Sequence, residues 1–185
     1  MKPVKQIMVK PGMSVVELVE ALASCGVLGA GRLAKAANLL LEILSDREYR
    51  VFLAVAGPAV PGGMRRIIAE LVGLGLVDAL VTTGANVTHD LVEALGFNHW
   101  QGSLQTDDRK LRGEGYGRIG DIYVEQKAFE ALEREVYRVL DEVKGEGEGK
   151  PLAVYEILWK LGEKAGKEGG GFILRAAAER KTPIF

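Results

Sequence analysis

The sequence predicts an α/β fold, a Rossmann-like parallel sheet with flanking helices. Segments 49–55 and 77–81 are short, apolar and β-branched, and each is followed by small loop residues and then by apolar residues at helical spacing. Two consecutive β–loop–α units imply parallel strands with right-handed crossovers. A third apolar segment at 183–185 has the character of a buried strand. The sheet is therefore expected to have further parallel members.

The first quarter of the chain is predicted to be a pair of helices. Ser14 and Glu17 have the spacing of a capping box, which favours the start of a helix. After two glycines, a second run of apolar residues at helical spacing predicts another helix. We therefore expect a helical segment at 1–48 that packs on the main α/β domain, residues 49–185.

The second half begins with a segment, 97–120, that is rich in turn residues and charges. Further elements then follow in order. They are a short strand or hairpin arm at 118–124, a charged amphipathic helix at 125–144, a surface connector at 145–150, a helix at about 151–162 with Pro151 in its first position, and a further helix before Pro183.

Composition excludes several classes of function. The 185 residues are 48% hydrophobic, which is enough for one compact domain with a buried core. The net charge is −1 with no basic patch, which argues against nucleic-acid binding. The sequence contains no run of about 18 apolar residues, so no membrane span is predicted. Cys25 is the single cysteine, and with two histidines it cannot build a protein-only zinc cage or an internal disulfide. We expect a soluble cytoplasmic protein without a metal.

Two loops are candidate ligand sites, 56–63 and 82–86. Each follows a predicted strand, and open parallel sheets bind ligands at the carboxyl ends of their strands. Small side chains there allow backbone N–H groups to approach a phosphate or ribose. The alternative is that both are tight turns that need small residues. His89 follows the second loop, where it either faces the ligand or is a solvated helix residue.

Other motifs are weaker. Residues 115–120 match G-x-G-x-x-G but precede a β-like segment rather than a helix, so no helix N-terminus would meet a pyrophosphate. Residues 29–34 open a helix but follow a helix, which indicates a turn between helices. His99 and Trp100 are interpreted as a packing pair, and Lys160 as part of a solvated helix face.

Four sequence blocks together resemble deoxyhypusine synthase, particularly its archaeal branch. In chain order they are GAGRL at 29–33, AGPAVPGGMR at 56–65, LVDALVTTGANVTHDL at 76–91 and GRIGD at 117–121. The similarity runs from about residue 10 to the C-terminus, and the last two blocks are the most specific. The resemblance implies an oligomeric, NAD-dependent transferase. Such an enzyme oxidises spermidine, holds its aminobutyl group as an imine on a lysine, and passes it to a lysine of the translation initiation factor 5A precursor.

The resemblance also implies site residues. Those matching the family's NAD contacts are Gly57, Pro58, Ala59, Val60, Pro61, Thr83, Gly84, Ala85 and His89. Thr88 and His89 match positions near NAD and the polyamine, where many relatives carry two acids. A neutral threonine and a histidine stand in their place here.

The family continues beyond the strand that 183–185 resembles, and its imine-forming lysine and polyamine-binding acids lie in that continuation. The expectation is therefore the N-terminal portion of the enzyme, lacking the C-terminal half of the family domain. It would be inactive without that half or a second subunit. Three alternatives stay open: a non-catalytic regulatory paralogue, a polyamine transferase like homospermidine synthase, and a generic nucleotide-binding α/β domain.

Overall fold

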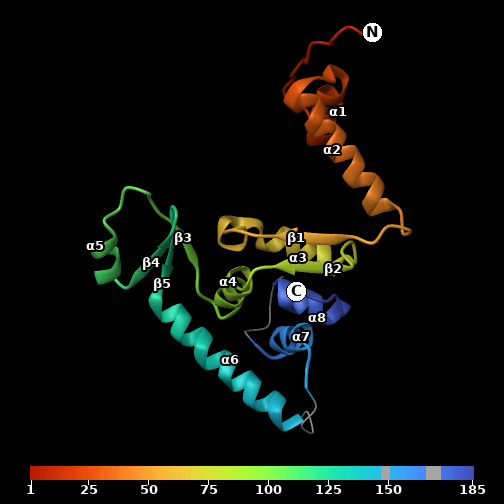
Figure 1. The fold of residues 1–185 in the computed structure, drawn as a ribbon. Coiled ribbons are helices and arrows are strands. Elements are labelled where there is room, and N and C mark those ends of the chain that lie inside the picture. Colours follow the sequence, from red (N-terminus) through yellow and green to blue (C-terminus); the bar gives the residue numbers. More distant parts are fainter. Residues whose placement is uncertain (147–150, 166–171) are drawn as a thin grey trace. The chain divides into compact units, whose positions relative to one another are not determined.

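A computed structural model describes residues 1–146, 151–165 and 172–185 (Figure 1). The chain divides into two compact units, Met1–Val51 and Phe52–Phe185. Most of the connector expected at 145–150 lies outside the described residues. That the first segment packs on the main domain stays a prediction.

The first unit is a pair of helices, α1 (Val15–Cys25) and α2 (Leu28–Ser45). The capping box is confirmed, because the Glu17 N–H donates to Ser14 Oγ at 3.2 Å and Glu17 Oε2 accepts the Ser14 N–H at 2.7 Å. Residues 29–34 open a helix that follows another helix, as expected, but the turn between the helices lies before them, at Gly26 and Val27. Gly31 is needed in α2 because a Cβ would overlap the Gly26 carbonyl group.

The second unit contains the parallel sheet. Strands β1 (Phe52–Val55) and β2 (Ala79–Thr82) pair in parallel, with Phe52 opposite Ala79. Ile184 forms a parallel bridge to Leu80 on the other side of β2. The Leu80 N–H donates to the Pro183 carbonyl at 3.0 Å, and the Phe185 N–H donates to the Leu80 carbonyl at 2.9 Å. The predicted parallel sheet with flanking helices is therefore confirmed, with β2 in its centre.

The connections after β1 and β2 are more helical than the sequence indicated. The first is a π-type turn, η1 (Val60–Met64), followed by α3 (Arg65–Gly73). The second is α4 (Gly84–Ala94), which begins inside the loop expected at 82–86. The reason is that the Thr83 hydroxyl caps α4 by accepting the Asn86 N–H at 3.4 Å.

Segment 97–120 forms part of a small antiparallel sheet. Its strands are β3 (His99–Gln101), β4 (Tyr116–Ile119) and β5 (Ile122–Glu125), in the order β3–β5–β4, with the short helix α5 (Asp108–Gly113) before β4. The predicted hairpin arm is thus a complete hairpin. Gly115 and Gly120, with φ of 83° and 63°, lie before β4 and in the β4–β5 turn, so the glycine motif serves backbone geometry.

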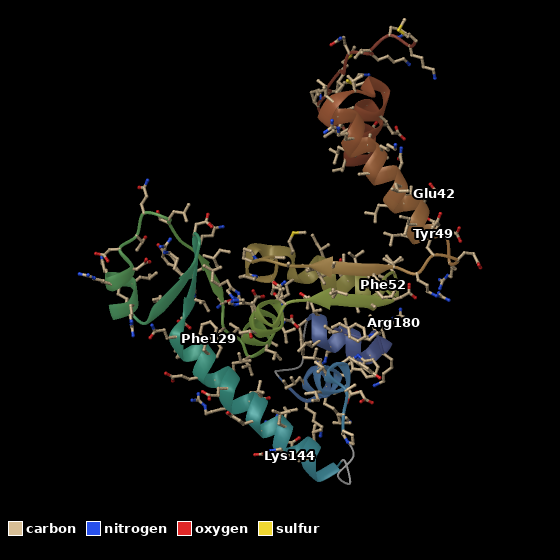
Figure 2. The ribbon with its side chains drawn as sticks, in the orientation of Figure 1. Glu42, Tyr49, Phe52, Phe129, Lys144 and Arg180 are labelled. Atoms are coloured by element: carbon tan, nitrogen blue, oxygen red, sulfur yellow. The ribbon has the colours of Figure 1, made fainter. Side chains whose placement is uncertain are left out.

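Three helices complete the second unit: α6 (Gln126–Glu146), α7 (Val154–Lys164) and α8 (Ile173–Arg180). Placing Pro151 at the first position of a helix is wrong, because Glu156 Oε2 accepts the Ala153 N–H at 2.7 Å and fixes the start of α7 at Val154. Helix α8 packs against both α7 and α3. Its last residue, Arg180 (Figure 2), donates from Nε to the Gly73 carbonyl at 2.6 Å.

Candidate functional site

The carboxyl ends of β1 and β2 are joined by one buried side chain, Asn86, which is 3% exposed. Its Nδ2 donates to the Val55 carbonyl at 3.3 Å and to Thr82 Oγ1 at 3.1 Å. Its Oδ1 accepts the Val60 N–H at 3.4 Å. A buried amide held by both strand ends and by η1 fixes the two loops relative to each other.

The predicted cofactor-binding residues lie along this edge in different environments. Gly57, Pro58, Thr83, Gly84 and Ala85 are exposed, Ala59 is half-buried, and Val60 and Pro61 are buried. The structure therefore brings the two segments to the same edge of the sheet. Val60 packs in the core, so of the first segment Gly57 and Pro58 offer the exposed surface.

Free hydrogen-bond donors lie at the start of α4. Within the described residues, the N–H groups of Gly84 and Ala85 have no acceptor, as is usual in the first turn of a helix. In the other segment the Gly62 N–H donates to the Pro58 carbonyl at 2.9 Å, and prolines have no N–H. No heavy atom lies within 4 Å of a Cβ placed on Gly84. An anionic group can therefore approach the start of α4, where the helix dipole favours it.

His89 lies farther along α4 and is 8% exposed, so it is not a solvated helix residue. Its Nδ1 is 2.9 Å from Nε2 of His99 on β3, and His99 Nδ1 is 2.7 Å from Oε1 of Glu93. The His89 ring also makes an edge contact with Phe129 of α6, at 6.1 Å between centroids. Burial, with a further effect of His99, lowers the pKa of His89 against the opposing effect of Glu93.

The interpretation of His99 and Trp100 as a packing pair is wrong. Neighbouring residues of a strand point to opposite faces, so the His99 side chain is 4% exposed whereas Trp100 is 47% exposed. Thr88 is half-buried, and its hydroxyl makes no hydrogen bond within the described part of the chain. In the structure His99 therefore pairs with His89 and not with Trp100.

A second polar cluster holds α4 against the neighbouring helices. Arg65 Nε donates to Asp90 Oδ1 at 2.7 Å, and Arg65 Nη1 lies 3.4 Å from Glu93 Oε2. The Asp90 carboxylate accepts the Ile173 and Leu174 N–H groups at 3.1 and 3.0 Å, which caps α8. Burial raises the pKa of Asp90, opposed by Arg65 and by these N–H groups. This cluster is structural, because Asp90 is 1% exposed.

A hollow of about 330 Å³ lies beside the site. It is lined by Pro61, His99, Trp100, Gln101, Gly102, Asp121 and Ile122. His99 and Pro61 connect it to the segments described above. Sequence reasoning missed the hollow because its walls come from η1 and from the small antiparallel sheet.

Within ranges 1–146, 151–165 and 172–185, no group of three or more His, Cys, Asp or Glu side chains is arranged to hold a metal ion. Nor does any helix in these ranges have the length and apolar character needed to span a membrane.

Known proteins share both sequence and fold with this chain. A model of the family "DS: Deoxyhypusine synthase" matches residues 17–185. A Methanothermobacter thermautotrophicus protein named "Probable deoxyhypusine synthase" is 41% identical over 183 residues, which cover 98% of this chain and 58% of that protein. An Archaeoglobus fulgidus protein named "Probable deoxyhypusine synthase 1" is 37% identical over 177 residues, covering 96% of this chain and 56% of that protein.

A solved structure supports the fold. The crystal structure of an Entamoeba histolytica protein assigned as a deoxyhypusine synthase matches with a TM-score of 0.64 and 16% identity, covering 94% of this chain and 58% of that one. At this level of identity the likeness concerns the fold. The chain spans a little over half the length of the curated relatives named above.

Proposed function

The chain belongs to the deoxyhypusine synthase family, and we propose that it forms the N-terminal part of an NAD-dependent transferase. The proposed substrate is spermidine, and the acceptor of its aminobutyl group is a lysine of the translation initiation factor 5A precursor, in the cytoplasm. Bound NAD would supply hydride-accepting chemistry. The residues of this chain bind and orient the reactants.

One observation carries the cofactor assignment. Two exposed small-residue segments meet at the carboxyl edge of the parallel sheet, joined by Asn86, and the N–H groups of Gly84 and Ala85 are free to donate. A pyrophosphate has the acceptor oxygens that such donors need. Gly57, with φ of 71° and no atom within 4 Å of a Cβ position, leaves room for a nucleotide beside β1.

The polyamine assignment rests on Thr88 and His89. Since the pKa of His89 is lowered, its ring is neutral near pH 7 and does not repel an ammonium group. In this proposal Thr88 and His89 attract the ammonium group by hydrogen bonding, whereas the paired acids of many relatives would attract it by charge. The proposal gives this chain no catalytic lysine and no metal.

The rest of the family sequence is proposed to be a necessary partner. The lysine that carries the aminobutyl group would lie in a C-terminal half, in the same polypeptide or in a second subunit, and the active assembly would be an oligomer. Exposed apolar side chains on α1 and α2 support an interface there, among them Val15, Val16, Leu33, Leu39, Leu40 and Leu41.

Calorimetric titration of NAD into the chain tests the cofactor site. Gly84→Glu places a carboxylate at the start of α4, where it repels a phosphate but does not harm the helix. We expect it to weaken NAD binding at least tenfold. Gly113→Glu, at an open position of α5, makes the same change in charge and should leave binding unchanged. Equal binding by both variants and the native chain would reject the site.

Reconstitution tests the reaction. The chain is mixed with the C-terminal part of the M. thermautotrophicus relative, NAD, labelled spermidine and the acceptor protein. Labelled acceptor is expected only when both parts are present. Product from the chain alone, or none from the mixture, would contradict the proposal. When putrescine is added as a competing acceptor, transfer to it instead would favour a homospermidine-type transferase, and stimulation of a full-length relative without turnover would favour a regulatory paralogue.

A further inference from the structure

We propose that Glu93, His99 and His89 form a proton-accepting chain whose open end, Nε2 of His89, takes a proton from an N–H or O–H group of a ligand at this edge of the sheet. His89 contacts the ligand in this scheme, and His99 and Glu93 are positioning residues. The ligand's identity rests on the proposed function. The direction of the chain rests on the hydrogen bonds and on a neutral His99, not on the ligand's identity.

The direction follows from the carboxylate. Glu93 Oε1 can only accept, so His99 Nδ1 carries the hydrogen in their 2.7 Å contact. A neutral His99 then has a lone pair on Nε2, and His89 Nδ1 must donate to it across 2.9 Å. The hydrogen of His89 is thereby held on Nδ1. Its Nε2 is left with a lone pair.

That lone pair is accessible. Within the described residues Nε2 of His89 has no hydrogen-bond partner, and no buried side-chain nitrogen or oxygen among them lacks one. Nε2 must therefore reach the surface, although the ring as a whole is 8% exposed and contacts Phe129. An N–H or O–H group of a ligand can therefore reach this atom in place of solvent.

The proton step balances without another reactant. The ligand's N–H or O–H bond breaks, its electron pair stays on the ligand, and a new N–H bond forms at His89 Nε2. The Nδ1 hydrogen of His89 passes to His99 Nε2. His89 ends neutral as the opposite tautomer, and the positive charge lies on His99 beside the Glu93 carboxylate.

The surrounding groups fix the geometry of this chain. Arg65, from α3, lies 3.4 Å from Glu93 Oε2 and orients the carboxylate, while its Nε is bound to Asp90. From α6 the contact to His89 is the uncharged Phe129. The two rings cannot both be charged in this arrangement, since two N–H groups would then face each other across the 2.9 Å contact. One proton is therefore the capacity of the pair.

Nitrogen-15 NMR of histidine-labelled chain at pH 7.5 tests the direction. We expect both rings to carry hydrogen on Nδ1, with His89 Nε2 unprotonated. In Glu93→Gln, Arg65 should hold the amide oxygen, so the amide N–H₂ faces His99 and both rings should switch to the Nε2–H tautomer. Glu133→Gln, an exposed change on α6, should leave the tautomers unchanged. An Nε2–H tautomer of His89 in the native chain would overturn the proposal.

Titration of the same sample identifies the ligand group. A change of the His89 Nε2 resonance with spermidine would assign an ammonium donor, and a change with NAD would assign a hydroxyl or amide donor of the nucleotide. Glu93→Gln is expected to weaken binding of the active ligand about tenfold. If NAD binds in a manner sensitive to Gly84→Glu but neither ligand moves the resonance, the relay is wrong and the proposed cofactor site stands. If spermidine moves it but NAD does not bind, the cofactor site fails and the relay stands.

Discussion

At the scale of single residues, the site depends most on Asn86, because its side chain makes hydrogen bonds to Val55, Val60 and Thr82. Asn86→Ala would leave the buried Val60 N–H without its acceptor and would remove one of the two side-chain donors to the Val55 carbonyl. We expect the free energy of unfolding to fall by about 1–3 kcal/mol, measured by urea denaturation. Asn38→Ala, on an exposed face of α2, is the control and should change it by less than about 0.5 kcal/mol. Equal losses would mean that Asn86 does not hold the strand ends.

His89 predicts how stability depends on pH. Its pKa in the folded chain is lowered, first by burial and then by His99, whereas in the unfolded chain it is about 6.5. Between these two values the unfolded chain binds more protons, so stability falls as the pH is lowered through about 6.5 and levels off below the folded pKa. Urea denaturation between pH 8 and pH 5 measures this slope.

The matched variant for that slope is His89→Asn, whose amide can still donate to His99. It removes the titrating ring, so the fall in stability below about pH 6.5 should become shallower. Because His99 is the other histidine of the chain, any slope that remains in this range belongs to it or to the acids. An unchanged slope would show that His89 does not link folding to protonation.

At the scale of elements, the contact of α7 with α8 depends on Gly162. A Cβ at this position would overlap the carbonyl group of Leu174, which is backbone and cannot move aside cheaply. Gly162→Ala should therefore destabilise the chain by about 1–3 kcal/mol. Gly73→Ala, at the end of α3, places its Cβ 4.0 Å from Ala176 of the same helix α8 and should be neutral or stabilising. Thermal unfolding of both variants compares them, and effects of the same sign would refute this packing argument.

Local pattern was sufficient for most elements. The capping box at Ser14 and the two β–loop–α units follow from residue spacing and are present, and the strand expected at 183–185 is present as a parallel bridge of Ile184 to Leu80. Boundaries were less predictable. Helix α4 starts earlier than expected because the Thr83 hydroxyl caps it. Gly31 lies inside a helix because its Cα approaches the Gly26 carbonyl group closely, a contact that residue spacing does not reveal.

The site was predictable at the level of segments but not of partners. Strand ends identify 56–63 and 82–86 as neighbours, and the structure brings them together through Asn86. His99 could not be found in this way, since its place beside His89 depends on how the small antiparallel sheet meets α4. The signal that could have indicated it is that neighbouring residues of a strand point to opposite faces, which separates His99 from the exposed Trp100.

At the scale of the whole molecule, the two units differ in how much apolar surface they bury. In Met1–Val51 the buried apolar residue is Ala34, whereas Leu40 is 55% exposed and Leu41 67% exposed. In Phe52–Phe185 the apolar side chains at the centre of the sheet and on the inner face of α8 are buried, and Leu174 is 1% exposed. Burial of apolar surface is the main source of stability, so the first unit is expected to be the less stable of the two.

Hydrogen exchange followed by mass spectrometry measures that difference. A pair of helices with so little buried area opens locally at a small cost in free energy, so amides of α1 and α2 should exchange at least about 100-fold faster than those of α8. Equal protection would contradict this. Adding the C-terminal part of a relative discriminates further. If the exposed leucines form an interface with another chain, exchange in α2 should slow while α8 keeps its rate, whereas a general slowing of both would indicate that the added part stabilises the fold as a whole.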